Sequence, residues 1–390
     1  MEVTPFEIRV SQEKLDDLRL RLGRTRWPDE IPGSGWEHGA SLPYLAELAD
    51  YWLERFDWRA QEAALNRFHH FRATVGGLGI HFLHERGRGP DPFPLVVTHG
   101  WPGSFVEMVK LIPLLIDPAA HGGDPEDAFD VVVPSLPGFG FSDRPAERGV
   151  NVFRTAAVWD ELMTGLGYRR YGAQGGDFGA GVSTVLGLRH AEHVAGVHLN
   201  YIPGSYRPAL GPGSPPLAAE EEAFLRDADA WYAEEGGYAH QQRTRPQTLA
   251  FGLNDSPVGL AAWMVEKLRA WSDCGGDLET RFSKDEVLTQ VMIYWVSETI
   301  SSSVRYYFEG RLAPLHFAPG ERVSVPCGIA RFSLEAPFPP RSWIERGYEV
   351  RRWTEMPRGG HFAAWEEPEL LARDVREFFR PLRWVAQTGA

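Results

Sequence analysis

The sequence has few cysteines, a shortage of cations relative to acids, and no long hydrophobic run. Only two cysteines occur in 390 residues, Cys274 and Cys327, which is too few for a disulfide framework or a cysteine-based zinc site and fits a reducing cytoplasm. Acidic residues outnumber basic ones, 53 to 40, giving a net charge of −13. Because phosphate backbones are bound through clustered Lys and Arg, this balance argues against nucleic acid as a partner.

Signals for export or membrane insertion are also missing. The first residues, Met1 to Pro5, show no basic stretch followed by an apolar one. No segment approaches the roughly 20 apolar residues that span a bilayer. We therefore expect a soluble, cytoplasmic protein without a membrane anchor, and a homodimer is compatible with the sequence. Hydrophobic residues make up 43% of the chain, which is ordinary for globular proteins and sufficient for a sizeable core.

Differences in composition and in hydrophobic pattern divide the chain into four segments. Residues 1–72 are rich in helix formers and predict a helical N-terminal region, with Ser11 as the first helix cap. Residues 73–201 alternate short apolar runs with helical patterns, which indicates an α/β fold with a mostly parallel sheet. Residues 202–315 combine a Pro/Gly-rich stretch with long amphipathic helices, as expected of a helical cap domain over the sheet. Residues 316–390 return to strands and a final helix, and complete the α/β core.

The expected strands are short and apolar, and the expected helices are amphipathic. The strands are predicted at 94–98, 129–133, 168–174, 194–199, 323–332 and 348–353. The main helices are predicted at 42–56, 152–166, 179–188, 218–234, 260–272, 284–303 and 368–379.

The strongest local signal for chemistry is a glycine-rich turn around Asp177. The pattern Gly175-x-Asp177-x-Gly179 follows an expected strand and opens an expected helix, which is the setting of the nucleophile elbow of α/β-hydrolases. A carboxylate stands where a serine is usual, and the helix N-terminus favours an anion there. The alternative is an aspartate that only caps the helix. The pattern predicts Asp177 as a nucleophile.

A base and an acid should follow the nucleophile in chain order, as in other α/β-hydrolases. His361, after Gly359-Gly360 and before the last helix, is the predicted base. Glu335, just beyond the strand predicted at 323–332, is the predicted acid that orients it. Asp143 is the reserve candidate for the acid, although it precedes the nucleophile.

Two backbone N–H groups are predicted to form an oxyanion hole. The segment His99-Gly100-Trp101-Pro102-Gly103 ends the first clear strand, where such folds place one donor. The other donor belongs to the residue after the nucleophile. We therefore assign the N–H groups of Trp101 and Phe178, with an ordinary strand-end turn as the alternative.

Taken together, these motifs resemble those of the microsomal-type epoxide hydrolases, a family of the α/β-hydrolase superfamily, over nearly the whole chain. The resemblance rests on a helical N-terminal region and on the family's H-G-W-P, G-G-D-W and histidine elements. They correspond here to His99-Gly100-Trp101-Pro102, Gly175-Gly176-Asp177-Phe178 and Gly359-Gly360-His361-Phe362. The chain departs from the family in having Phe178 for tryptophan and no proline after Phe332. No membrane helix precedes the N-terminal region, so the resemblance is to a soluble, bacterial-type member.

The resemblance implies an activity and further site residues. It implies a cis peptide bond before Pro102, and ring-opening tyrosines at Tyr238 and Tyr307, with Tyr306 as second choice to Tyr307. The implied reaction converts an epoxide to a vicinal diol through an Asp177 ester, which water activated by His361 hydrolyses. It implies no cofactor and no metal.

The substrate and the biological role are less defined. Aromatic residues in the cap suggest a small apolar or aromatic epoxide, either a xenobiotic or a secondary metabolite such as an enediyne fragment. Two alternatives remain open at this point. One is a haloalkane or haloacid dehalogenase with the same nucleophile, and the other is a catalytically silent relative that binds a ligand.

Overall fold

The computed structural model describes residues 1–383, which fold around a single nine-stranded sheet. Its strand order is β1-β2-β3-β5-β4-β6-β7-β8-β9. The pairs β1–β2, β2–β3 and β3–β5 are antiparallel, and all others are parallel. The strands are β1 (Val3–Phe6), β2 (His70–Val75), β3 (Leu78–Glu85), β4 (Phe93–Thr98), β5 (Phe129–Pro134), β6 (Tyr171–Gly175), β7 (Val194–Leu199), β8 (Val323–Arg331) and β9 (Tyr348–Glu355).

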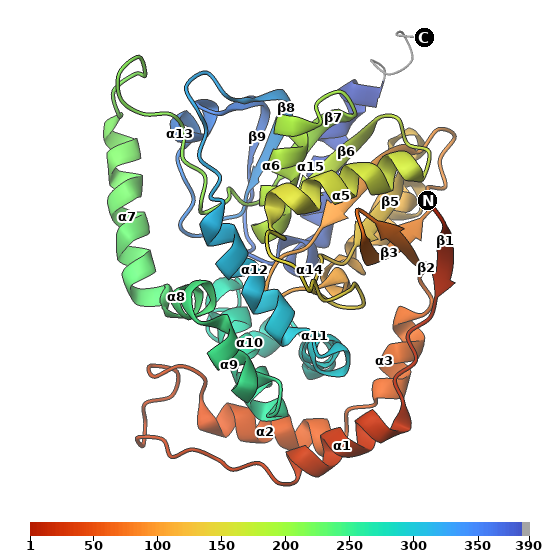
Figure 1. Ribbon diagram of the computed structural model, residues 1–390, viewed down its shortest axis with the longest axis vertical. Coiled ribbons are helices and arrows are strands. Elements are labelled where there is room, and N and C mark those ends of the chain that lie inside the picture. The colour runs from red at the N-terminus through yellow and green to blue at the C-terminus, as the bar shows by residue number, and fades with distance from the viewer. Residues whose placement is uncertain (384–390) are drawn as a thin grey trace.

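Helices cover both faces of this sheet (Figure 1). The helices α5 (Val152–Gly165) and α6 (Asp177–Arg189) pack together on one face, whereas α4 (Leu111–Ile116) and α15 (Pro368–Arg383) pack together on the other. Every residue of β5, β6 and β7 is buried. Burial on both faces explains why these strands are continuous apolar runs and not alternating ones. The predicted α/β-hydrolase fold with a mostly parallel sheet is confirmed.

Six helices form a cap between β7 and β8, and Figure 1 shows them to one side of the sheet. The first two, α7 and α8, meet at Gly236. The predicted helix 284–303 is in fact two helices, because Glu298 adopts a left-handed conformation (φ 56°) and ends α11. The cap helices are α7 (Ala219–Glu235), α8 (Gly237–Thr244), α9 (Pro246–Leu253), α10 (Pro257–Trp271), α11 (Lys284–Ser297) and α12 (Ile300–Leu312).

The N-terminal segment contributes to both the sheet and the cap. Its helices are α1 (Gln12–Leu22), α2 (Leu42–Glu54) and α3 (Trp58–Leu65), and Ser11 caps α1 by accepting from the backbone N–H of Lys14. The helical expectation overlooked β1, whose four residues pair with β2 at the edge of the sheet. Such a short strand with a proline at its centre has no sequence pattern of its own, because its pairing partner lies far along the chain.

The same segment fastens the cap from outside. Figure 1 shows α1 and α2 on the side of the cap away from the sheet, and both contact α10. Tyr51 donates a hydrogen bond to Asp285 (2.9 Å), and Lys14 donates one to the carbonyl oxygen of Val296 (2.8 Å). Within residues 1–383, no helix combines the length and the apolarity needed to cross a membrane.

The remaining short helices lie near the ends of strands in the core. The segment after β4 forms a 3-10 turn at Phe105–Met108, α13 (Arg341–Glu345) precedes β9, and α14 (Ala363–Glu366) follows it. The predicted strands are all present, with ends that differ from the prediction by no more than three residues.

Candidate active site

Asp177 occupies a sharp turn between β6 and α6. Its φ is 45°, a left-handed conformation that is costly for any residue with a side chain. The turn is also crowded, because a Cβ added to Gly175 would lie 2.2 Å from the carbonyl carbon of Gly179. A Cβ on Gly179 would lie 1.9 Å from the carbonyl oxygen of Thr98, and one on Gly100 would lie 2.3 Å from Asp177 Oδ1. Strain and crowding thus hold the Asp177 carboxylate above the carboxyl end of the sheet.

The predicted oxyanion-hole loop meets this carboxylate. The backbone N–H of Trp101 donates to Asp177 Oδ1 at 2.9 Å, and the peptide bond between Trp101 and Pro102 is cis, as the resemblance implied. Phe178 follows Asp177 in the first turn of α6, where backbone N–H groups have no partner within the helix.

The cap helix α11 holds this loop from above. Gln290 donates to the carbonyl oxygen of Pro102 (2.7 Å) and accepts from the Ser104 hydroxyl (2.7 Å), and Tyr294 donates to the carbonyl oxygen of Gly103 (2.7 Å). All of these groups are buried. The cap therefore positions part of the catalytic machinery proposed for the core.

His361 lies on the other side of the carboxylate. Its Nε2 is 3.6 Å from Asp177 Oδ2, and its Nδ1 is 2.9 Å from Glu335 Oε2. Burial lowers the pKa of His361, but the Glu335 and Asp177 carboxylates raise it by more, so the pKa lies well above its usual value. The reserve candidate Asp143 is occupied elsewhere, because it accepts from Arg72 and from the backbone N–H of Gly79. The structure thus brings Glu335, not Asp143, to His361.

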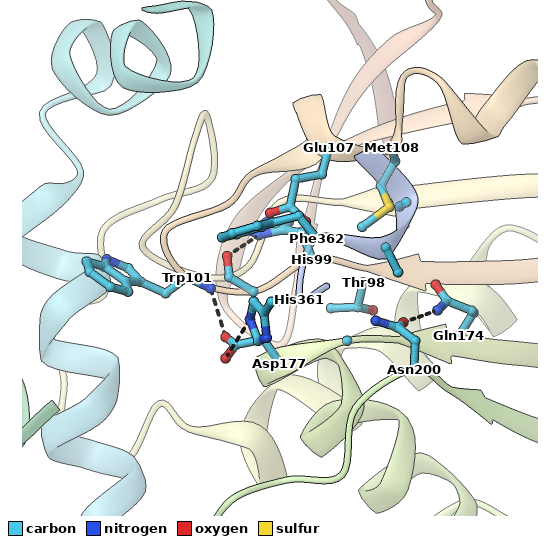
Figure 2. Close-up of a pocket in the computed structure, with 14 residues that line it drawn as sticks. Thr98, His99, Trp101, Glu107, Met108, Gln174, Asp177, Asn200, His361 and Phe362 are labelled. Carbon is cyan, nitrogen blue, oxygen red and sulfur yellow. Dashed lines mark hydrogen bonds and ion pairs between the residues drawn. The ribbon is translucent and has the colours of Figure 1, made fainter. Parts of the chain in front are cut away.

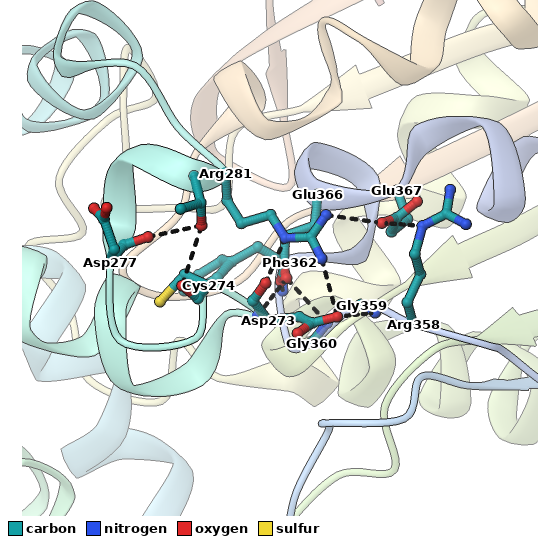
Figure 3. Close-up of polar contacts among 11 residues, drawn as sticks. Asp273, Cys274, Asp277, Arg281, Arg358, Gly359, Gly360, Phe362, Glu366 and Glu367 are labelled. Atoms are coloured by element: carbon teal, nitrogen blue, oxygen red, sulfur yellow. Dashed lines mark hydrogen bonds and ion pairs between the residues drawn. The ribbon is translucent and has the colours of Figure 1, made fainter.

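Two acids, the half-buried Glu366 and the buried Glu367, anchor the loop that carries His361 to the cap (Figure 3). Glu366 accepts from the backbone N–H groups of Gly360 (3.0 Å), Phe362 (2.9 Å) and Asp273, a cap residue (2.7 Å). Burial raises the pKa of Glu366 to about 7, against the opposing effect of these three donors. Arg281 of the cap adds an ion pair to Glu367 at 3.1 Å. These contacts fix the loop that carries His361 relative to both the core and the cap.

The two predicted tyrosines come from different cap helices and meet above Asp177. Tyr238 of α8 stacks on Trp101 with 5.5 Å between ring centroids, and Tyr307 of α12 meets Tyr238 edge-on at 5.9 Å. Burial and the charge of Asp177 raise the pKa of Tyr238, and burial is also the largest cause of the raised pKa of Tyr307. Both hydroxyls therefore stay protonated at neutral pH. Tyr306 instead shares a hydrogen bond with Thr155 (2.8 Å).

Asp177 borders three cavities: one of about 80 Å³ that Trp271, Glu335 and His361 also line, and two that differ more strongly in size. The larger is a cleft of about 540 Å³ whose lining includes aromatic side chains and arginines, among them Phe178, Tyr201, Tyr232, Tyr238, Tyr307, Arg207, Arg243 and Arg311. The smaller, of about 20 Å³, has a lining of mixed polarity, with His361 and Glu107 among its polar members (Figure 2). The arrangement offers a substrate site on an anionic nucleophile and a separate space of the size of a water molecule.

Sequence reasoning did not single out Glu107 or Trp271. Glu107 is 7% exposed, and burial is the main reason that its pKa is raised to about 8. Its signal was available, since it is a lone acid in the apolar run Phe105-Val106-Glu107-Met108-Val109. Trp271 packs against both His361 (5.2 Å) and Tyr238 (5.0 Å), a role that follows from cap docking and leaves no mark in the sequence.

Comparisons with known proteins give a consistent result. The family model described as "Epoxide hydrolase N terminus" matches residues 3–108, and that of the "alpha/beta hydrolase fold" matches residues 94–259. A provisionally named epoxide hydrolase of Stigmatella aurantiaca is 47% identical over 98% of this chain and 86% of its own. Epoxide hydrolase 1 of Oryctolagus cuniculus is 39% identical over 96% of this chain and 88% of its own. The structure of Aspergillus niger epoxide hydrolase superposes with a TM-score of 0.84 at 30% identity, covering 98% of this chain and 97% of that one.

Proposed function

Because the chain belongs to the epoxide hydrolase family, we propose that it converts an epoxide to a vicinal diol through a covalent ester on Asp177. One observation carries the proposal. Two protonated tyrosines from the cap line the same cleft as a carboxylate that has the His361–Glu335 pair beside it. The tyrosines can donate hydrogen bonds to the oxygen of an epoxide ring, and the carboxylate can attack a ring carbon. The histidine can then act as the base that activates water.

The first step opens the ring. Tyr238 and Tyr307 bind the epoxide oxygen, and one of them transfers its proton as the carbon–oxygen bond breaks. Asp177 Oδ2 attacks the ring carbon from the opposite side and forms the ester, while Oδ1 stays hydrogen-bonded to the N–H of Trp101. No base is needed, because a carboxylate is already ionised near neutral pH.

The second step hydrolyses the ester. Esterification removes the negative charge of Asp177, one of the causes that raise the pKa of His361, and so favours the neutral ring that can act as a base. His361 takes a proton from water, and the hydroxide adds to Cγ of Asp177. The oxyanion lies against the N–H groups of Trp101 and Phe178, where one such donor typically contributes about 10²–10³ in rate. His361 returns its proton to the departing alkoxide, and the acid form of Asp177 re-protonates the tyrosinate.

Trapping the ester tests the scheme. His361→Gln should form the ester but fail to release diol, so mass spectrometry after incubation with styrene oxide should show an adduct on the peptide that contains Asp177. Asp177→Asn is the control that cannot form it. An unmodified peptide in His361→Gln, despite measured binding, would contradict the proposal.

Isotope labelling tests the source of the new hydroxyl oxygen. In a single turnover in ¹⁸O water, the diol should be unlabelled and the label should enter Asp177, because the diol oxygen comes from the carboxylate. Label in the first-turnover diol would rule out the ester.

The aromatic lining of the cleft supports a substrate with an apolar or aromatic body. A dehalogenase with the same nucleophile would need halide-binding donors in place of the tyrosine pair. Release of chloride from haloalkanes, without diol formation from epoxides, would favour that alternative.

A further inference from the structure

The cleft above Asp177 has an excess of positive charge. Arg207, Arg243 and Arg311 line it, and Asp177 is the only carboxylate in its lining, as far as residues 1–383 show. This contrasts with the chain as a whole, in which acidic residues exceed basic ones by 13. A cleft with one sign of charge concentrates ligands of the opposite sign.

These arginines also have no acidic partner in the described part of the chain. Arg207 donates to the carbonyl oxygens of Gly204 (3.0 Å) and Tyr206 (2.7 Å), and Arg243 donates to that of Ala239 (3.2 Å). Backbone carbonyls satisfy donors but do not neutralise a guanidinium charge. Many other arginines do pair with acids. Arg346, for example, forms an ion pair at 2.6 Å with the buried Glu221.

The positive charge reaches the interior of the cleft. Burial raises the pKa of Tyr232, and the charges of Arg207 and Arg243 both oppose that rise. Arg243 acts in the same direction on Tyr238, one of the proposed ring-opening tyrosines. Both arginines line the same cleft as Asp177 and Tyr238, so one ligand in this cleft can contact them and the reaction site.

We propose that the substrate has an anionic group, such as a carboxylate, remote from its epoxide, and that Arg207 and Arg243 bind this group. The inference rests on the proposed epoxide hydrolysis and adds a substrate class to it. The cleft volume of about 540 Å³ accommodates an apolar body between the ring and the anion. Guanidinium–carboxylate pairs are charge-assisted and strong where water is partly excluded.

Terminal epoxy acids of graded chain length, each with its methyl ester, test this proposal. At the best length, the wild type should hydrolyse the acid with a kcat/KM about tenfold above that of the ester. Arg207→Gln and Arg243→Gln should each reduce this acid-to-ester ratio to near one. Arg245→Gln is the matched control, because Arg245 is exposed in the same part of the cap and lies outside the cleft lining.

The possible failures are distinguishable. Equal rates for acid and ester at every length, or a ratio that survives both substitutions, would overturn the anionic substrate and leave epoxide hydrolysis standing. Failure to form diol from acids, esters and styrene oxide alike would contradict the hydrolase proposal as well.

The small cavity supports a second inference independently. Its volume of about 20 Å³ suffices for one water, which needs roughly 10–15 Å³ and two to four polar partners. His99 is not a free partner, because its Nδ1 is 2.9 Å from the carbonyl oxygen of Gly100 and its Nε2 accepts from the N–H of Leu136. Glu107 and His361 reach the same cavity beside Asp177 (Figure 2).

Glu107 reaches this position because the neighbouring residue has no side chain. A Cβ on Gly103 would lie 1.1 Å from Glu107 Oε1, so the carboxyl group fills the space that a side chain at Gly103 would take. Burial, with a smaller contribution from Asp177, raises the pKa of Glu107 to about 8, while His361 opposes the rise. The group is thus mostly neutral at pH 7 and can accept a hydrogen bond without adding charge.

We infer that the small cavity binds the water that hydrolyses the ester, with one hydrogen donated to His361 and the other to Glu107. Held at both hydrogens, the water directs a lone pair to Cγ of Asp177. This inference also rests on the proposed ester. It predicts that Glu107 affects the second step and not the first.

Single-turnover kinetics with styrene oxide can separate the two steps. Glu107→Met removes the acceptor at similar volume and should slow ester hydrolysis about 10²-fold, so that the Asp177 ester accumulates while its rate of formation changes less than threefold. Glu107→Gln retains a carbonyl acceptor and should recover most of the rate. Glu107→Ala, which also lacks an acceptor, decides the matter if Glu107→Met does not fold.

A purely structural role would slow both steps together in Glu107→Met, and that result would overturn the inference. If Glu107→Met and Glu107→Ala both hydrolysed the ester at the wild-type rate, the inference would be overturned as well. Absence of any ester in His361→Gln would instead contradict the underlying hydrolase mechanism.

Discussion

The two carboxylate oxygens of Asp177 have different neighbours. Oδ1 accepts from the N–H of Trp101, and Oδ2 is the oxygen nearer His361. The first is placed to become the oxyanion during ester hydrolysis, and the second is free to bond to carbon. The division of roles within one side chain therefore follows from its surroundings, before any substrate binds.

Two adjacent tyrosines offer a matched test of the ring-opening step. Tyr307→Phe should slow ester formation about 10²-fold, the lower range for a general acid, because its hydroxyl faces Tyr238 above Asp177. Tyr306→Phe should leave that rate nearly unchanged and cost about 1 kcal/mol of stability, since its hydroxyl is used by Thr155. Stopped-flow tryptophan fluorescence and urea unfolding measure the two effects. Equal losses of rate in both variants would contradict the assignment of Tyr307.

The residues of the candidate site differed in how far the sequence revealed them. Asp177 and His361 could be predicted from glycines and chain order, because the elbow and the late loop impose local constraints. Tyr238 and Tyr307 were implied only by resemblance, since their meeting depends on how cap helices pack. Glu107 was missed although a lone acid in an apolar run marks it as unusual, because the sequence does not show which cavity such an acid enters.

At the scale of elements, Asp374 joins α15 to the sheet. Its carboxylate bonds to His198 of β7 (2.8 Å) and to Arg352 and Thr354 of β9 (both 2.6 Å). Burial alone would raise its pKa, but these partners outweigh burial and lower it to about 2. The folded chain therefore binds this proton more weakly than the unfolded chain, whose aspartates have an ordinary pKa near 4.

The lowered pKa of Asp374 predicts the pH range in which this residue stabilises the folded chain. Asp374 contributes about 2 kcal/mol of stability above pH ~4, and this contribution is lost as the pH falls from ~4 towards ~2. Urea unfolding of the wild type and Asp374→Asn at pH 6, 4 and 3 should show a stability difference that narrows with acidity. A difference that stays constant would show that the carboxylate charge does not matter.

Helix α11 is the element through which the cap acts on the oxyanion-hole loop. Gln290→Leu would leave the carbonyl oxygen of Pro102 and the hydroxyl of Ser104 buried without this partner, at about 1–3 kcal/mol each. We expect a lower kcat as well, because the N–H of Trp101 would lose its fixed position. Thermal unfolding and diol formation measure both effects, with exposed Gln247 of α9 changed to leucine as the control. Unchanged kcat in a destabilised Gln290→Leu would show that the loop keeps its position unaided.

Element prediction succeeded where a segment was buried on both faces and failed where pairing was remote. Strand β7 has the predicted bounds, because six consecutive buried residues leave a continuous apolar run. Strand β1 was missed because four residues with Pro5 among them become a strand only beside β2. The break at Glu298 was missed because a left-handed residue other than glycine has no composition signal.

In the molecule as a whole, the N-terminal segment, the α/β core and the cap share one hydrophobic core. A continuous cluster of buried side chains extends from Ile8 and Leu18 through Val291 of the cap to Phe379 of α15. The order of the four segments could be predicted from the sequence because each has its own composition and hydrophobic pattern. How the first segment closes over the cap was not, since those contacts join residues more than 200 positions apart.

This shared core predicts cooperative unfolding. Far-UV circular dichroism, tryptophan fluorescence and loss of activity should give coincident urea transitions, because the cap cannot separate without exposing apolar surface of its neighbours. A fluorescence or activity transition well before the loss of helix signal would show that the cap unfolds on its own.

The crowded glycines around the nucleophile limit how the gene can change. Any missense codon at position 100, 175 or 179 adds a carbon atom between 1.9 and 2.3 Å from a heavy atom of Asp177, Gly179 or Thr98, far inside contact distance. Gly252 and Gly310 have no such neighbour within 4 Å. Random drift thus meets no steric barrier at these two positions of the cap, whereas the codons beneath the reacting carbon are held to glycine.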